Sequence, residues 1–266
     1  MASQLFSFLS RGQTIFLTIL MAGIFFACSS LDPQVRGTRP VSHALFDTLL
    51  KKHVKENGLV DYAAWKNDQA QLKQYLDILT LNPPNDNRWT QEEKLAYWIN
   101  LYNAFTIDLI LQYYPVASIK DIGSSIQVPF VNTPWDIKFI DIAGKKYDLN
   151  NIEHNIIRKN FNEPRIHFAV NCASISCPKL RREAYTGEKL NHQLDEQTKD
   201  FLNDKVRNDI SEGQVKVSKL FKWYRGDFVK ETSLREFLRK SSGIAIREDR
   251  KILYMDYNWS LNEAKD

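Results

Sequence analysis

The stretch from Thr90 to Pro115, TQEEKLAYWINLYNAFTIDLILQYYP, sets the architecture of this chain. Thr90 and Glu93 have the spacing of a capping box, in which each side chain satisfies the other residue's backbone amide at the start of a helix. Apolar residues follow on nearly every helical face, and Pro115 disfavours a helical conformation at the residue before it. The sequence therefore predicts a buried central helix from about Thr90 to Tyr114.

Two asparagines, Asn100 and Asn103, interrupt this apolar helix. They are three residues apart, so they share one helical face. A buried amide without hydrogen-bond partners costs about 1–3 kcal/mol, so each asparagine must find partners. Two interpretations stay open: the pair satisfies the backbone of a neighbouring loop, or it forms the polar wall of a binding cleft.

Shorter elements are expected on both sides of the central helix. The segment from Ser42 to about Asn57 has one apolar stripe and is stopped by Gly58. A second helix is expected to follow, with Leu72, Tyr75, Leu76 and Leu79 facing inward. After the central helix, residues 137–148 alternate around an Ala-Gly turn and predict a hairpin. Further helices are expected near 148–160, 190–201 and 233–243, and strands over 165–172, 215–217 and 252–259.

This order of elements predicts an α+β fold, in which N-terminal helices pack on a mainly antiparallel sheet. The apolar positions continue without a linker, so we expect a single domain over residues 41–262. The composition is that of a globular protein, with 266 residues, 43% hydrophobic and 26% charged. The net charge of +4 comes from interspersed charges and is too small to predict a nucleic-acid partner.

The N-terminus has the composition of a targeting segment. Arg11 precedes an almost wholly apolar run over residues 14–27, which is too short for a bilayer span of about 20 residues but suits a secretory signal. The run ends at Cys28 and resembles the bacterial lipoprotein signal, although Phe25 stands where leucine is usual. We expect a signal peptide over residues 1–27, a lipid on Cys28 and a tether over residues 28–40.

This resemblance implies a lipoprotein of the bacterial cell envelope, facing the periplasm or attached to the outer membrane. Its partners would be the membrane, through the N-terminal lipid, and an envelope peptide, glycan or protein. An ordinary cleaved signal peptide and a short anchor helix remain alternatives.

The residues able to carry chemistry gather between positions 153 and 177: Glu153, His154, Arg158, His167, Asn171, Cys172, Ser174 and Cys177. A cysteine nucleophile needs a base within hydrogen-bond reach and a group that orients the base. His154, with Glu153 beside it, is the candidate base for Cys172. The predicted strand excludes His167 from this role, because five residues of strand separate it from Cys172 by about 16 Å.

Other interpretations of the same residues remain open. Cys172 and Cys177 form an even pair that predicts a disulfide in an oxidising compartment, or they are two buried thiols. The two histidines and two cysteines are also ligand types that zinc prefers, but their spacing matches no zinc pattern. We therefore expect neither a metal nor a cofactor.

Several strings resemble the DUF547 family of uncharacterised proteins: residues 59–62, 96–104, 152–158, 165–181 and 223–228. The resemblance covers roughly residues 42–240. It implies a fold related to papain-like and transglutaminase-like cysteine enzymes, but no established activity. Those enzymes place their nucleophile at the start of a central helix, and the helix predicted from Thr90 contains no cysteine.

Two functions are compatible with the sequence. The first is a lipid-anchored envelope protein with a polar binding cleft and no turnover. Its cleft residues would be Asn100, Asn103, Arg158, His167, Asn171 and Ser174. The alternative is a cysteine-dependent hydrolase or acyl/amide transferase acting on peptide-like or envelope substrates through Cys172, His154 and Glu153.

Overall fold

The computed structural model describes residues 39–123 and 133–265. The predicted signal peptide, Cys28 and nearly all of the predicted tether lie outside the described residues. The described residues belong to one unit of mutual contacts. In this part of the chain, no helix is long and apolar enough to cross a membrane.

The central helix is present as α4, Gln91–Tyr113. The predicted capping box forms: Thr90 Oγ1 accepts the Glu93 N–H at 3.2 Å, and Glu93 Oε2 accepts the Thr90 N–H at 2.7 Å. Every residue of α4 from Ile99 to Leu111 is buried, which confirms the prediction of a helix enclosed on all sides.

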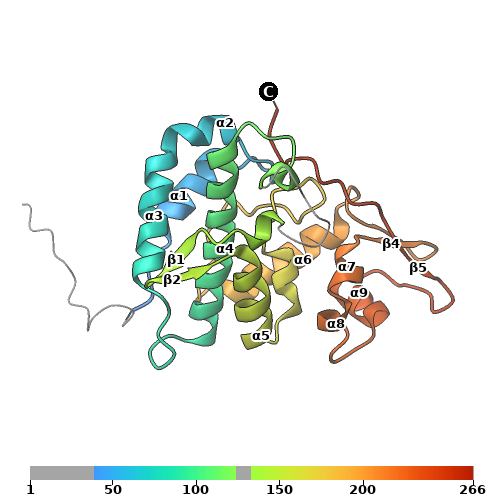
Figure 1. Ribbon diagram of the computed structural model, residues 1–266. Helices are drawn as coiled ribbons and strands as arrows, with labels where there is room; N and C mark the ends of the chain where they lie inside the picture. The colour runs from blue at the N-terminus through green and yellow to red at the C-terminus, as the bar shows by residue number, and fades with distance from the viewer. Residues whose placement is uncertain (1–38, 124–132, 266) are drawn as a thin grey trace, which may run out of the picture. The chain divides into compact units, whose positions relative to one another are not determined.

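Among the described residues, three α-helices precede α4, on the left of Figure 1. They are α1 (Ala44–His53), α2 (Tyr62–Trp65) and α3 (Gln69–Leu81). Helices α2 and α3 contact α4, and α1 packs on α2 and α3. Their apolar faces form the first hydrophobic core together with α4 and the following hairpin. This core contains most of the buried aromatic side chains of the N-terminal half.

The predicted hairpin consists of β1 (Ile140–Ile142) and β2 (Lys145–Tyr147), paired antiparallel with Ile140 opposite Tyr147. Ala143 and Gly144 form the turn with φ angles of 50° and 83°, the left-handed conformation that such two-residue turns require. Ile140 and Ile142 are buried and attach the hairpin to the first core.

A second hydrophobic core lies in the C-terminal half, around the fully buried Phe168. Its strands pair in the order β3-β4-β5, antiparallel between β3 and β4 and parallel between β4 and β5. The elements are α6 (Leu190–Asn203), β3 (Asp209–Ile210), β4 (Val215–Val217), α7 (Leu220–Trp223), α8 (Arg225–Phe228), α9 (Leu234–Ser242) and β5 (Ile252–Tyr254). The predicted α+β class is confirmed, with small sheets.

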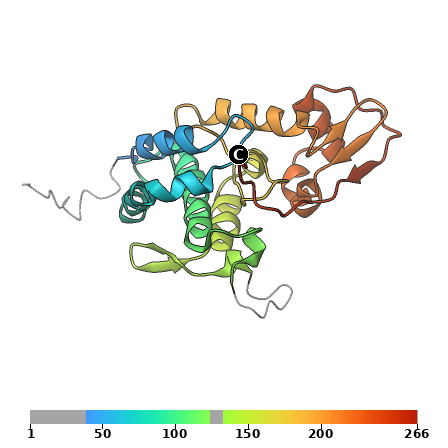
Figure 2. The same cartoon turned by 90° about the horizontal axis from the view of Figure 1, so that it is seen from above.

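Helix α6 connects the two cores. Seen from above in Figure 2, it runs from the N-terminal helices towards the orange and red C-terminal elements. It contacts α4 on one side and α9 on the other. Its inward residues divide accordingly, since Leu190 and Leu194 belong to the first core and Phe201 and Leu202 to the second.

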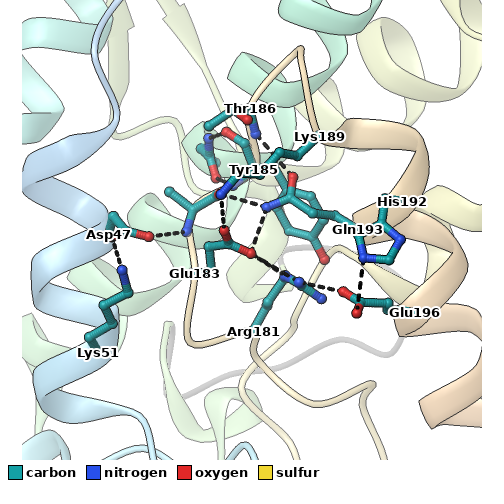
Figure 3. A network of polar contacts seen from close by, with 12 residues as sticks. Asp47, Lys51, Arg181, Glu183, Tyr185, Thr186, Lys189, His192, Gln193 and Glu196 are labelled. Carbon is teal, nitrogen blue, oxygen red and sulfur yellow. Dashed lines mark hydrogen bonds and ion pairs between the residues drawn. The ribbon is translucent and has the colours of Figure 1, made fainter.

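A polar network holds the segment 181–189 between α1 and α6 (Figure 3). Glu183 is at its centre and accepts hydrogen bonds from Arg181 at 2.9 Å and from Gln193 of α6 at 3.0 Å. Asp47 of α1 accepts a backbone N–H of the same segment at 3.1 Å. Side chains of α1 and α6 therefore hold this loop by hydrogen bonds, as a neighbouring strand would.

The strand predicted over residues 165–172 is wrong. Pro164–Phe168 form a 3-10 helix, η5, and the chain continues in turns. Side chains replace the partner strand: Gln197 donates to the last carbonyl of η5 at 3.1 Å, and Asn103 donates to the Ala169 carbonyl at 3.0 Å. The alternating residue pattern of segment 165–172 arises because this compact loop is buried on two sides.

The helix expected near 148–160 is present, but its first part differs from an α-helix. Asn151–Ile157 form a π-helix, η4, which continues into α5, Arg158–Asn160. π-Helical turns occur frequently at functional sites, because the wider winding changes the direction of neighbouring side chains. Here the turn contains Glu153 and His154.

Candidate ligand-binding site

A pocket of about 230 Å³ lies where η4, the loop after η5, α7 and the C-terminal segment meet. Aromatic side chains predominate in its lining: Tyr102, Trp135, Trp223, Tyr224, Tyr257 and Trp259. Its ionisable side chains are Glu153, His154 and His167, and the two cysteines complete one wall. Large apolar surface with a few placed polar groups is the composition of a ligand site.

One side of the pocket is an aromatic cluster. Tyr257 lies between Trp223 and Trp259, with ring centroids 4.8 and 4.6 Å away, and Trp135 contacts Trp259 at 5.6 Å. Trp223 remains 47% exposed. An exposed tryptophan in contact with other rings presents a flat apolar face at the mouth of the pocket.

At the base of the pocket, His167 is paired with Asp227 of α8. His167 Nε2 lies 2.7 Å from the carboxylate, and Arg158 Nε donates to the same oxygen at 2.6 Å. Burial lowers the pKa of His167, and the hydrogen bond from His167 holds the pKa of Asp227 far below its usual range. His167 is therefore neutral at pH 7, with its proton on Nε2 and its Nδ1 lone pair available.

Nδ1 of His167 and Oε1 of Glu153 have no hydrogen-bond partner among the described residues, although both atoms are buried. Tyr224 covers this region: its ring stacks on His167 at 3.9 Å, and Arg158 lies 5.0 Å from its centroid. Burial and the nearby Glu153 carboxylate raise the pKa of Tyr224, so its hydroxyl stays protonated. The site contains unsatisfied polar atoms beside a phenol donor.

Cys172 and Cys177 are joined in a disulfide, with 6.2 Å between their Cα atoms. A disulfide sulfur is not a thiolate, so the Cys172–His154 dyad does not form in this state. Cys172 is partly exposed, whereas Cys177 is buried. Ser174 is also buried, and its hydroxyl donates to Tyr257 at 3.3 Å.

The structure brings together five of the residues singled out on the sequence: Glu153, His154, His167, Cys172 and Cys177 all line the pocket. The strand argument against His167 is corrected, because the chain between His167 and Cys172 is folded and not extended. Arg158 lies behind the pocket, where it bonds His154 Nδ1 at 3.0 Å as well as Asp227.

The predicted cleft residues Asn100, Asn103 and Asn171 are not among the described residues that line the pocket. Asn100 exchanges two hydrogen bonds with the backbone of Tyr185, at 2.7 and 3.0 Å. Asn103 likewise donates a hydrogen bond to Ala169 O and accepts one from the Asn171 N–H. This geometry agrees with the first interpretation, in which Asn100 and Asn103 satisfy the backbone of neighbouring loops.

Sequence reasoning did not connect several site residues with the candidate cysteines. Asp227 and Tyr224 were part of a string that resembles the family, but the sequence assigned them no role. Trp223, Tyr257 and Trp259 come from segments more than 40 positions beyond the cysteines, and no local spacing links them to the site. Among residues 39–123 and 133–265, no group of three or more His, Cys, Asp or Glu side chains could hold a metal ion.

Residues 87–202 match the family model described as a protein of unknown function, DUF547. The resemblance drawn from the sequence strings is thereby confirmed over this range, as is the uncharacterised status. No curated protein and no solved structure matches the chain. The predicted relation to papain-like and transglutaminase-like folds is not confirmed. The matched range contains α4, η4, η5 and the disulfide, whereas Asp227 and the tryptophans at the pocket mouth lie beyond it.

Proposed function

We propose that this chain is a lipid-anchored protein of the bacterial cell envelope that binds a glycan in the aromatic pocket and does not chemically convert that glycan. The observation that carries the proposal is the pocket itself, with six aromatic side chains around Glu153, His154 and His167. Aromatic rings offer apolar faces that pack against the C–H faces of sugar rings. Carboxylate and imidazole groups accept and donate hydrogen bonds to hydroxyls.

The charge of the pocket fits a neutral polar ligand. The Glu153 carboxylate faces the Tyr224 phenol, and Arg158 is already engaged by Asp227 and His154. No uncompensated cluster of one sign is present among the described lining residues. A sugar ring would supply hydroxyl donors to the buried Glu153 oxygen without bringing a charge that must be desolvated.

Binding without turnover is supported by the state of the cysteines. The sulfur expected to act as a nucleophile is bonded to Cys177. In an oxidising envelope compartment the disulfide is the resting state of this pair, so Cys172 supplies no thiolate that could attack a glycan.

The binding experiment uses the full chain and soluble β-1,4-linked N-acetylglucosamine oligosaccharides as the probe. Three pocket tryptophans, Trp135, Trp223 and Trp259, should report occupancy by a change of intrinsic fluorescence. Trp223→Ala is expected to weaken binding about tenfold, because it removes the exposed apolar face. Tyr113→Ala is the matched control, since Tyr113 is equally exposed, at 48%, and lies outside the pocket lining.

Saturable binding that Trp223→Ala weakens and Tyr113→Ala leaves unchanged supports the proposal. Absence of saturable binding to these oligosaccharides and to intact cell-wall glycan contradicts it. Anchoring is tested separately by labelling with a radioactive fatty acid. The full chain should incorporate the label and Cys28→Ala should not; equal labelling of both would contradict lipidation at Cys28.

One observation favours the alternative of a cysteine-dependent hydrolase or transferase: a neutral His167, oriented by Asp227, lines the same pocket as Cys172. This function requires the reduced cysteine. A peptide or ester hydrolysis activity that appears with reductant and is abolished in Cys172→Ser would establish it. Activity that survives in Cys172→Ser would exclude Cys172 as the nucleophile.

A further inference from the structure

We propose that Cys172 and Cys177 form a thiol–disulfide exchange site, in which Cys172 is the sulfur attacked by a thiol that enters the aromatic pocket. The reacting partner is a dithiol, free or carried by a peptide. This inference goes beyond glycan binding and does not depend on it. It is carried by the position of the bond in the pocket wall and by the different surroundings of the two sulfurs.

The two cysteines differ in accessibility. Both line the pocket, but Cys172 is partly exposed while Cys177 is only 2% exposed. An incoming thiolate must approach along the S–S axis from outside the sulfur that it attacks. Cys172 is therefore the sulfur that a thiol in the pocket can reach, because protein covers almost all of Cys177.

The buried sulfur is surrounded by hydrogen-bond donors. Cys177 Sγ accepts the backbone N–H of Cys172 at 3.0 Å and the hydroxyl of Tyr257 at 3.3 Å. The same hydroxyl lies 3.5 Å from Cys172 Sγ, so the backbone N–H is the donor that distinguishes the two sulfurs. Burial raises the pKa of Tyr257 to about 12, so this hydroxyl keeps its proton at neutral pH. Donors to a sulfur stabilise its thiolate, and a more stable thiolate leaves faster in exchange.

Hydrogen bonds to other segments hold the loop that contains Cys177. The buried Arg207 donates to Cys177 O at 2.5 Å and to Ile175 O at 2.8 Å, and its guanidinium also pairs with Asp204. On the other side, the Ile175 N–H donates to Ser260 O at 2.9 Å. The loop is therefore supported independently of the disulfide, which allows the bond to open without unfolding this region.

The exchange proceeds in two balanced steps. A substrate thiolate attacks Cys172 Sγ, the bond between the two cysteines breaks, and its electron pair stays on Cys177 Sγ as a thiolate. The second thiol of the substrate, after losing its proton, attacks the substrate sulfur of the mixed disulfide and releases Cys172 as a thiolate. The substrate dithiol is oxidised to a disulfide, and the protein gains two electrons and two protons as two thiols.

The first test measures the wild-type full chain with dithiothreitol as the dithiol and an alkylating agent as the trap. Both cysteines should become alkylated in the folded protein, at a rate that rises linearly with the concentration of dithiothreitol. A disulfide that opens only when the protein unfolds, with a rate independent of dithiothreitol, would overturn the proposal. This measurement needs no substitution and so does not depend on the folding of a variant.

The second test determines which sulfur reacts, with glutathione disulfide as the probe and intact mass as the readout. Cys177→Ser should form a mixed disulfide at Cys172, whereas Cys172→Ser should react at least tenfold more slowly, because Cys177 is covered. Equal rates, or faster reaction of Cys172→Ser, would contradict the assignment.

The third test concerns the leaving group. Tyr257→Phe removes one donor to Cys177 and keeps the ring, so the reduction rate should fall about threefold to tenfold while Tm changes little. Tyr254→Phe is the matched control on β5, outside the pocket lining, and should leave the rate unchanged. An unchanged reduction rate in Tyr257→Phe would show that the Tyr257 hydroxyl takes no part in the exchange.

Discussion

At the scale of single residues, buried side-chain amides satisfy loop backbones in this protein. Asn103 of α4 accepts the Asn171 N–H at 2.8 Å and donates to Ala169 O at 3.0 Å. Gln197 of α6 likewise donates hydrogen bonds to the backbone carbonyls of Phe168 and Lys179. These contacts position the loop that carries the disulfide, so they determine the pocket without lining it.

Replacing Asn103 with alanine should therefore destabilise the protein strongly. The substitution leaves a buried N–H and a buried carbonyl unpaired, with an expected loss of about 2–4 kcal/mol in the free energy of unfolding. Urea denaturation measures the difference. Asn155→Ala, at an exposed position of η4, should change the same quantity by less than about 0.5 kcal/mol. Equal losses in the two variants would contradict the assigned role.

His43 should make the stability depend on pH. Burial lowers its pKa to about 4, and the hydroxyl of Tyr75 lies 2.7 Å from its Nδ1. Between pH 6.5 and about 4 the unfolded chain binds the proton more readily than the folded protein does. The free energy of unfolding should therefore fall as the pH falls through this window, by at most about 1.4 kcal/mol per pH unit from this group.

Urea unfolding at several pH values tests this contribution. His43→Gln should make the dependence shallower but not abolish it, because burial also lowers the pKa of His167. His192→Gln is the control, since His192 is exposed on α6, and its pH profile should match the wild type. A His43→Gln profile as steep as that of the wild type would show that His43 does not contribute.

At the scale of elements, α4 depends on its first turn as well as on burial. Thr90 and Glu93 satisfy two backbone N–H groups that the helix itself cannot pair. Thr90→Ala should lower the free energy of unfolding by about 1 kcal/mol, measured by urea denaturation. Gln91→Ala, at the next position, should change the free energy of unfolding much less. A comparable loss in Gln91→Ala would show that helix propensity, and not the capping box, explains the effect of Thr90→Ala.

The turn that joins Val54 and Val60, which pair in an antiparallel bridge, is equally specific. Gly58 has a φ of 79°, and a Cβ at this position would lie 2.4 Å from Lys179 Cβ. Gly58→Ala should destabilise the protein by more than about 1 kcal/mol through backbone strain and overlap. Gly226→Ala, where nothing lies within 4 Å and φ is not positive, should be neutral or slightly stabilising by the same measurement. The opposite order of stability would contradict this account.

At the scale of the whole molecule, Asp227 links three segments that are distant in sequence. It accepts from Arg158 of α5 and from His167 of η5 while it lies on α8. This contact closes the base of the pocket against the second core, because Phe168 and Phe228, the neighbours of two of these residues, both pack in that core.

Removing this carboxylate should affect both stability and the pocket. Asp227→Ala leaves Arg158 and His167 without their acceptor, with an expected loss of about 2–4 kcal/mol in the free energy of unfolding. Asp256→Ala breaks an ion pair between the fully exposed Asp256 side chain and the partly exposed Lys219, and it should leave Tm unchanged within error. Differential scanning calorimetry compares the two, and equal Tm values would show that the buried cluster is not stabilising.

Much of the architecture followed from local patterns. The capping box, the stop at Pro115 and the turn at Ala143-Gly144 act within a few residues, so the central helix and the hairpin were predictable. The segment 165–172 was mispredicted because side chains of α4 and α6, and not a neighbouring strand, bond its backbone. Such partners lie dozens of positions away, and periodicity contains no information about them.

The sequence alone determined the α+β class, the buried central helix, the family resemblance and the pair of cysteines, because each depends on residue type and short spacing. The tertiary structure alone decided which of these residues form a site. It placed His167 in the same pocket as Cys172, gave it Asp227 as a partner and closed the pocket with aromatic side chains from the last 50 residues. The physical reason is that a pocket is a property of surfaces meeting across the fold, and the free energy that brings them together is spread over two hydrophobic cores.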